Sequence, residues 1–319
     1  MMTRNGENMT KKQDYTVVTA GSTYLDIDAY ACCIAMRELL VLQGRNAVAW
    51  SPARTNYSIC PSLADGAAIL TALPEDFAPE RAKYVVVDVS DPDYIKESVP
   101  LGQVTEVYDH HVGFEAYWED RIGKGARIEF IGAAATLIYR EWEKCGMTDR
   151  MTRETARLLI AAILDNTLNL TSSNTTPQDT EAFEVLCRRA GVTSEWCGEY
   201  FSEVQAQVEA DLKNALFGDL KRLKDQTVLP PRIAQLCVWD TQRILERLPE
   251  IRQWFREGDG SWMINVIDLQ HRCSYFLCDS EFYQKEIERI FGVAFDGDVA
   301  RSAVPYLRKE IIKKACYTH

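Results

Sequence analysis

The order of apolar and polar positions divides the first half of the chain into strand-like runs separated by helix-like stretches. Three apolar, β-branched runs predict buried strands: "YTVVTA" (15–20), "YVVVDVS" (84–90) and "QVTEVYDH" (103–110). Helical periodicity follows the first run over about 28–43 and ends at Gly44, and it returns in "GAAATLIYREWEKCG" and "RETARLLIAAILDNT". Continuous apolar strands spaced by helices predict a parallel sheet with helices on both faces.

The pattern changes near residue 190. Residues 195–224 predict one long amphipathic helix, and strands are predicted at 233–239, 261–269 and 273–278, with the helical pattern "DTQRILERLPEIRQWF" between the first two. A chain of 319 residues is long enough for two cores. We therefore predict a disordered leader over 1–14, an α/β domain over 15–192 and a smaller α/β domain over 193–319.

Composition narrows the class of protein. The chain is 46% hydrophobic and 26% charged, as in globular proteins, and it has no apolar run of the ~20 residues that span a membrane. The N-terminus lacks the apolar segment of a secretory signal, and ten cysteines without a C-x-x-C pair predict reduced thiols in a cytoplasmic protein. A net charge of −11 counts against extended nucleic acid as a partner, but it allows a local pocket for a small phosphate compound.

Acidic residues follow the predicted strands. Asp26 and Asp28 come after the first, where we expect both carboxylates to face one side of an extended turn. Asp88 ends the second, and the run "YDHH" ends the third with Asp109, His110 and His111. Because ligands bind at the carboxyl ends of parallel strands, these side chains are candidates for one site. Asp165 ends a helical run and is a further candidate.

Clustered carboxylates need a cation, because they cannot all stay ionised close together. Carboxylate and imidazole ligands suit Mn²⁺ or Mg²⁺, and two such ions can share a phosphoryl substrate. The alternative for each residue alone is structural: an Asp at a strand end is usually a helix cap or turn former, and paired histidines can be without a role. The conjunction of four such features favours a metal site.

The same motifs, in the same order, resemble the DHH phosphoesterase superfamily. The matching segments are "LDIDA" (25–29), "VVVDVSD" (85–91), "YDHHVG" (108–113), "GAAAT" (132–136) and "AILDNTLNLTSSNTTPQD" (162–179). In the second half, "GDLKRL" (218–223) and "DVARSAVPYLRK" (298–309) resemble the DHHA2 domain of manganese-dependent pyrophosphatases and exopolyphosphatases. The GGGH element of the nuclease branch is absent.

This resemblance implies a metal-dependent phosphohydrolase with its site in the cleft between the two domains. Two Mn²⁺ or Mg²⁺ ions would activate a hydroxide that attacks pyrophosphate, a short polyphosphate or a small phosphate ester. The resemblance assigns metal binding to Asp26, Asp28, Asp88, His110 and, if the turn shifts by one residue, Asp165. It assigns phosphate contacts to His111, Lys221 and Arg301, and it makes Asp109, in the same motif as the metal ligands, a further catalytic residue.

Three positions depart from the family pattern. Ser22 stands where the first family motif begins with His, Asn166 takes the position of the last aspartate in a gapless alignment, and Ser302 replaces a lysine next to Arg301. These changes keep an alternative open: a catalytically weak member that binds a phosphate ligand in a regulatory role. The oligomeric state also stays open, with a homodimer as one candidate. His271, after a predicted strand of the second domain, is expected at the surface or in the core.

Overall fold

The structure is a computed structural model that describes residues 14–21, 25–70, 72–218, 220–223 and 228–316. Ser22 and all but the last residue of the predicted leader lie outside the described residues. The chain divides into two compact units. The first comprises the described residues of Met1–Asn56, Ser62–Ile163 and Thr176–Gly191, and the second those of Tyr57–Pro61, Leu164–Thr175 and Val192–His319. The domain ranges predicted above were single stretches of chain, and where the domains divide stays a prediction.

A five-stranded parallel sheet of order β2-β1-β3-β4-β5 forms the centre of the first unit. Its strands are β1 (Thr16–Thr19), β2 (Ala47–Ala49), β3 (Lys83–Val87), β4 (Val104–Asp109) and β5 (Ala126–Ile128). The three strands predicted from apolar runs are β1, β3 and β4. The short strands β2 and β5 were not predicted, because three residues show no periodicity.

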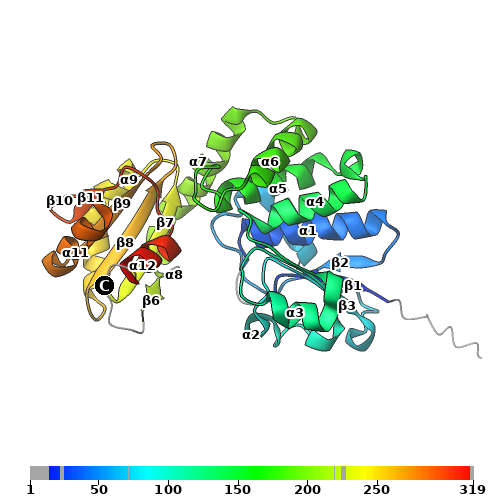
Figure 1. The fold of residues 1–319 in the computed structure, drawn as a ribbon. Helices are drawn as coiled ribbons and strands as arrows, with labels where there is room; N and C mark the ends of the chain where they lie inside the picture. The colour runs from blue at the N-terminus through cyan, green and yellow to red at the C-terminus, as the bar shows by residue number, and fades with distance from the viewer. Residues whose placement is uncertain (1–13, 22–24, 71, 219, 224–227, 317–319) are drawn as a thin grey trace, which may run out of the picture. The chain divides into compact units, whose positions relative to one another are not determined.

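Helices cover both faces of this sheet, as predicted (Figure 1). The helices of this unit are α1 (Ile27–Leu42), α2 (Pro92–Ile95), α3 (Glu115–Ile122), α4 (Ala134–Lys144), α5 (Arg153–Asn166, whose last residues belong to the second unit) and α6 (Pro177–Ala190). On one face, Val86 and Val107 pack with Ile95 of α2 and Trp118 of α3. Such full coverage explains why the strands are apolar on both sides.

A six-stranded mixed sheet of order β10-β11-β9-β8-β7-β6 organises the second unit. Its strands are β6 (Lys221–Arg222), β7 (Arg232–Val238), β8 (Trp262–Asp268), β9 (Cys273–Cys278), β10 (Phe295–Asp296) and β11 (Val299–Arg301). Its helices are α7 (Ser194–Ala210), α8 (Leu212–Gly218), α9 (Gln242–Glu246), α10 (Leu248–Arg256), α11 (Glu281–Phe291) and α12 (Arg308–Cys316). Only β7 and β8 pair in parallel among the described strands of this sheet.

Two predicted helices of the second unit are each two helices in the structure. The prediction of one helix over 195–224 is wrong, because the chain breaks at Asp211, whose carboxylate accepts hydrogen bonds from Tyr57 Oη and Asn214 Nδ2, both at 3.0 Å. The helix over 240–255 breaks at Arg247, just before Pro249, a residue that favours the first turn of a helix.

None of the described helices combines the length and apolar character that crossing a membrane requires. All ten cysteines lie in the described part of the chain and carry free thiols.

Candidate metal centre

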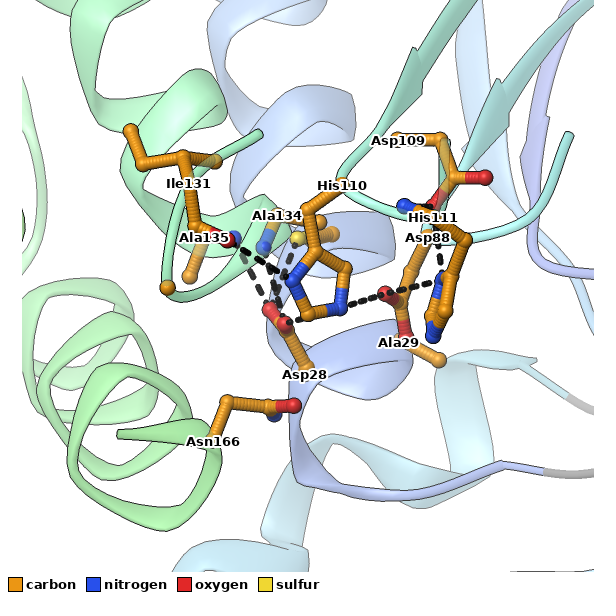
Figure 2. A network of polar contacts seen from close by, with 12 residues as sticks. Asp28, Ala29, Asp88, Asp109, His110, His111, Ile131, Ala134, Ala135 and Asn166 are labelled. Atoms are coloured by element: carbon orange, nitrogen blue, oxygen red, sulfur yellow. Dashed lines mark hydrogen bonds and ion pairs between the residues drawn. The ribbon is translucent and has the colours of Figure 1, made fainter. Parts of the chain in front are cut away.

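Three neighbouring strand ends carry the predicted motifs of the first unit. The strands β1, β3 and β4 are adjacent and parallel, so their carboxyl ends lie at one edge of the sheet. The strand order reverses between β1 and β3, and open α/β sheets bind ligands at such a point. Asp26 and Asp28 follow β1, Asp88 follows β3, and the DHH motif begins at the last residue of β4. Figure 2 shows Asp28, Asp88 and the DHH motif side by side.

Asp88 directly follows β3 in a left-handed backbone conformation, with φ at 58°. Few residues other than glycine adopt this region without cost, although aspartate tolerates it better than most. The amide of Asp88 donates to Tyr108 O at 2.7 Å, which fixes the turn against β4. Its carboxylate is only 7% exposed, and Oδ1 has no hydrogen-bond partner among the described residues. Strain and an unsatisfied buried oxygen at one residue are typical of functional sites.

Asp26 and Asp28 belong to the start of a helix, so the expectation of an extended turn is wrong. Asp26 is the N-cap of α1 and accepts from Ala29 N at 3.0 Å. Asp28 is fully buried in the first turn of α1 and reaches the N-terminus of α4, where it accepts from Ala134 N at 2.9 Å and Ala135 N at 2.8 Å. A helix N-terminus stabilises a carboxylate, so these two amides offset part of the cost of burying Asp28.

His110 is buried, with 5% of its side chain exposed, and its two ring nitrogens have different environments. Nδ1 lies 3.2 Å from Ile131 O, and because a carbonyl only accepts, Nδ1 carries a proton. In the neutral ring Nε2 then presents a lone pair, and it lies 3.5 Å from Asp88 Oδ1 and 4.0 Å from Asp28 Oδ2 (Figure 2). Histidine ligands of metals are oriented by the same kind of bond from the other ring nitrogen.

His111 differs from its neighbour in exposure, with 64% of its side chain accessible. Its backbone amide and its ring Nδ1 both lie near Asp109 Oδ1, at 3.1 Å and 2.9 Å. Asp109 is fully buried at the end of β4. Burial raises the pKa of Asp109, but the hydrogen bond and the charge of the His111 ring, together with the nearby Ser90 hydroxyl and the His111 amide, outweigh burial and hold the pKa below its ordinary value. Because Nδ1 of His111 faces Asp109, the other ring nitrogen, Nε2, is directed away from Asp109.

The carboxylates around His110 repel one another. Burial, followed by the charge of Asp26, raises the pKa of Asp28 to about 7. Burial and the charges of Asp28, Asp26 and Asp109 raise the pKa of Asp88 well above its ordinary value. Burial also raises the pKa of Asp26, although Ala29 N and His111 oppose this. A cation is the usual remedy for such a cluster.

These residues fit a divalent metal ion. The ligand atoms of Asp88, His110 and His111 lie within 4.8 Å of one another, and in the described part of the chain no other group of three His, Cys, Asp or Glu residues does so. The unpartnered Asp88 Oδ1 and the Nε2 lone pair of His110 converge, with Asp28 beside them. Oxygen and imidazole donors without cysteine suit Mn²⁺ or Mg²⁺.

Asp165 and Asn166 are the last two residues of α5, and adjacent helical residues point about 100° apart, so only one of them can face a given direction. Asp165 belongs with the second unit, where its Oδ1 lies 3.5 Å from Tyr200 Oη. The pKa of the Cys237 thiol is raised first by burial, then by the negative charge of Asp165 and then by that of Asp268. Metal binding by Asp165 stays a prediction.

Lys221 and Arg301 lie on opposite faces of the second sheet. Lys221 pairs with Ile233, whose side chain packs in the cluster containing Ile287 of α11 and Ile311 of α12. Arg301 pairs with Tyr275, which packs in the cluster of the other face, with α8 and α10. Paired residues share a face. Three strands separate β6 from β11, so the two backbones are about 19 Å apart at ~4.8 Å per strand, and the structure does not bring them together.

Several groups around the site carried no signal in the sequence. They are the carbonyl of Ile131, the amides of Ala134 and Ala135, the thiol of Cys32, which donates to Asp28 Oδ1 at 3.4 Å, and the hydroxyl of Ser90, which donates to His111 O at 3.1 Å. The amides fall in the "GAAAT" run and Ser90 in the "VVVDVSD" run, but neither segment indicated which of its groups would hold the site. Which backbone amides hold a site residue can be inferred only once the start of α4 is known.

The fold and the site together define a two-unit α/β protein with a carboxylate–imidazole centre at the carboxyl ends of a parallel sheet. Among curated proteins, the chain is 26% identical over 225 residues to "Probable manganese-dependent inorganic pyrophosphatase" of Lactobacillus acidophilus, covering 70% of each chain. It is 24% identical over 305 residues to the protein of the same name from Deinococcus radiodurans, covering 86% of this chain and 89% of that one. No family model matches the chain.

Solved structures share the fold over most of the chain. One, the "Methanococcus jannaschii putative family II inorganic pyrophosphatase", matches 95% of this chain and 98% of its own at a TM-score of 0.62 and 18% identity. An exopolyphosphatase-related protein from Bacteroides fragilis matches 95% of this chain and 90% of its own at a TM-score of 0.51 and 12% identity. The comparisons confirm the predicted resemblance to the DHH phosphoesterase superfamily.

Proposed function

We propose that the protein is a metal-dependent phosphohydrolase that cleaves a phosphoanhydride or a small phosphate ester. The observation that carries this proposal is the convergence of Asp88 Oδ1, Asp28 Oδ2 and the lone pair of His110 Nε2 at one edge of the sheet. Relatives named manganese-dependent pyrophosphatases support the metal and the reaction class. Mn²⁺ or Mg²⁺, when bound, supplies a nucleophile from water at neutral pH and neutralises charge on the phosphoryl group.

We assign different roles to the buried and the exposed residues of the site. His110, Asp88 and Asp28 are buried, so we assign them, with Asp26, to holding the metal. His111 is exposed, and we assign its Nε2 to the phosphate or to the leaving oxygen. The ionised Asp109 beside Nδ1 stabilises a positive charge on this ring, and a charged imidazole binds phosphate oxygen more strongly than a neutral one.

Pyrophosphate and short polyphosphates are the substrates that the relatives' names favour. The chain has Ser22 and Ser302 where the family has His and Lys. Fewer cations suit a less highly charged substrate, and therefore small phosphate esters stay in the proposal. Arg301 and Lys221 are assigned to phosphate by the resemblance alone. Since they lie on opposite faces of a sheet, a small phosphate compound can contact only one of the two, and the resemblance does not choose between them. A site between the domains and a homodimer are also proposals.

A phosphate-release panel tests the proposed function. Purified protein is incubated with saturating Mn²⁺ or Mg²⁺ and with pyrophosphate, tripolyphosphate, longer polyphosphate, nucleotides or p-nitrophenyl phosphate, and its metal content is measured on the same sample. Metal-dependent release from at least one compound is expected, and it should vanish with EDTA. No release from any compound by metal-loaded protein would contradict the hydrolase and favour a binding role.

A further inference from the structure

Ser90 connects the two strand-end segments that carry the metal-binding residues. It lies two residues after Asp88, and its hydroxyl donates to His111 O at 3.1 Å. The side chain is buried, with 1% of the residue exposed. The bond therefore joins the segment after β3 to the segment after β4, with its donor buried and its acceptor on an exposed residue.

Trp118 of α3 fixes Ser90 in turn. Its indole Nε1 donates to Ser90 O at 2.6 Å, and the ring is fully buried against Val86, Val107 and Ile95. A buried tryptophan needs a partner for its N–H, and here the partner is a carbonyl next to the candidate site. Two hydrogen bonds thus connect the buried core of this unit to the candidate site, one from Trp118 to Ser90 and one from Ser90 to His111.

His111 needs this support more than His110 does. The ring of His110 is held by burial, whereas 64% of the His111 side chain is exposed and its ring packs edge-on against that of His110, with centroids 4.3 Å apart. Its peptide unit is instead held at both ends of the residue: the amide on Asp109 Oδ1 and the carbonyl on Ser90 Oγ. Because the peptide group is planar, fixing that carbonyl also fixes the amide of Val112.

We propose that Ser90, held by Trp118, is a positioning residue that orients His111 toward the phosphate. The ring's role rests on the proposed function, but the orientation does not. Ser90 touches neither metal nor substrate in this account. Its contribution is to keep an exposed imidazole in one geometry, so that less conformational freedom is lost when the substrate binds.

The test is Ser90→Ala, with Ser90→Thr retaining a hydroxyl. In metal-free protein, hydrogen exchange measured by mass spectrometry over 108–113 should be about 3- to 10-fold faster in Ser90→Ala, the range for one lost hydrogen bond. Manganese affinity should stay within about 2-fold, since the metal ligands are held by other bonds. Turnover should fall by a similar 3- to 10-fold at nearly unchanged KM, and Ser90→Thr should recover most of both effects.

Two further variants keep the test decisive. Trp118→Phe preserves an aromatic ring but removes the N–H donor, and it should speed exchange in 108–113 in the same direction and by less. Ser98→Ala removes another serine hydroxyl of this unit, which donates to Ile95 O at 3.2 Å, and should leave 108–113 unchanged. Unchanged exchange over 108–113 in Ser90→Ala overturns the proposal whatever the activity. Faster exchange in a wild-type protein that hydrolyses nothing supports the positioning role and defeats only the proposed function.

Discussion

Each unit contains an aspartate at the end of a strand that holds an exposed histidine in the same way. In the first unit, Asp109 Oδ1 lies 3.1 Å from His111 N and 2.9 Å from His111 Nδ1. In the second, Asp268 Oδ1 lies 2.8 Å from His271 N and 3.0 Å from His271 Nδ1. Both aspartates are buried, at 0% and 1% exposed, and the histidine side chains are 64% and 51% exposed. Locally the two pairs are nearly equivalent.

Their surroundings separate them. The second oxygen of Asp268 accepts from Thr241 N at 3.2 Å and Thr241 Oγ1 at 2.9 Å, which ties the end of β8 to the start of α9. The second oxygen of Asp109 has no partner among the described residues, and Asp88 and His110 lie nearby. An Asp–His pair therefore follows a strand end in both units and does not by itself mark a metal centre. It becomes a candidate metal centre only where further ligands are left with unsatisfied atoms.

The largest expected effect comes from removing a buried ligand. Asp88→Asn or His110→Ala should lower metal-dependent phosphate release by at least about 10²-fold, because the metal contributes several kcal/mol to stabilising the transition state. His271→Ala, which removes the equivalent exposed histidine of the second unit, should leave release within about 2-fold. Initial rates at saturating Mn²⁺, with circular dichroism to confirm folding, provide the measurement. Equal losses of phosphate release in His271→Ala and His110→Ala would contradict a metal centre confined to the first unit.

The paired aspartates should separate activity from stability. Asp109→Asn should reduce turnover by about 10- to 10²-fold, as expected for a group that orients a catalytic histidine. Asp268→Asn should leave turnover unchanged and instead lower the free energy of unfolding by about 1–3 kcal/mol, because a buried acceptor of four donors is altered. Urea unfolding and steady-state kinetics on both variants test this. A turnover loss in Asp268→Asn alone would reverse the assignment.

Stability of the metal-free protein should depend on pH through the same carboxylates. A carboxyl group whose pKa is raised by folding binds more protons in the folded state than in the unfolded state, so stability falls as pH rises between its two pKa values. For Asp28 this window runs from 3.8 to about 7. Metal-free protein should therefore melt at least about 3 °C higher at pH 5.5 than at pH 7.5, and Mn²⁺ should restore stability at pH 7.5.

The variant Asp88→Asn is the control for that pH dependence. It removes one of the mutually repelling charges, and it should narrow the difference in melting temperature between pH 5.5 and pH 7.5. Scanning calorimetry in EDTA follows both proteins. Metal-free protein that is more stable at pH 7.5 than at pH 5.5 would contradict the described electrostatics.

The smallest expected effect is a gain. Ser22→His restores the residue that the family has at this position and should tighten the binding of one Mn²⁺ ion by a few-fold, about 1 kcal/mol. Ser302→Lys restores a second of the three family residues that this chain lacks and should lower the KM for pyrophosphate without changing metal affinity. Calorimetric Mn²⁺ titration and pyrophosphate kinetics distinguish the two substitutions. No change in either variant would mean that these departures do not limit the site.

Much of the fold was predictable because burial leaves a pattern. The strands β1, β3 and β4 are apolar on both faces and were predicted from that feature, as were β7, β8 and β9. Predictions failed where a single residue overrides periodicity. The non-helical backbone of Asp211 ends α7, and Arg247 separates α9 from α10, which has Pro249 in its first turn. Strands of two or three residues, such as β5 and β6, are defined by pairing with a neighbour, which no local pattern reveals.

The candidate site was predictable for residue type and order, but not for geometry. The sequence placed Asp28 in an extended turn, whereas it lies in a helix and binds two amides of α4 more than 100 positions away. Such a contact depends on tertiary structure alone. The same holds for Ser90 and Trp118, because the sequence pattern does not show that Trp118 bonds to Ser90 or Ser90 to His111. Lys221 and Arg301 appear equivalent in sequence and lie on opposite faces of a sheet.

Calorimetric titration of metal-free protein with Mn²⁺ tests the central claim most directly, because it needs no substrate. Wild-type protein and His271→Ala should bind Mn²⁺ with the same affinity, whereas Asp88→Asn should bind it at least about 10²-fold more weakly, a loss of ~2.7 kcal/mol. Wild-type affinity in Asp88→Asn, or a comparable loss in His271→Ala, would contradict the metal centre described at the ends of β1, β3 and β4.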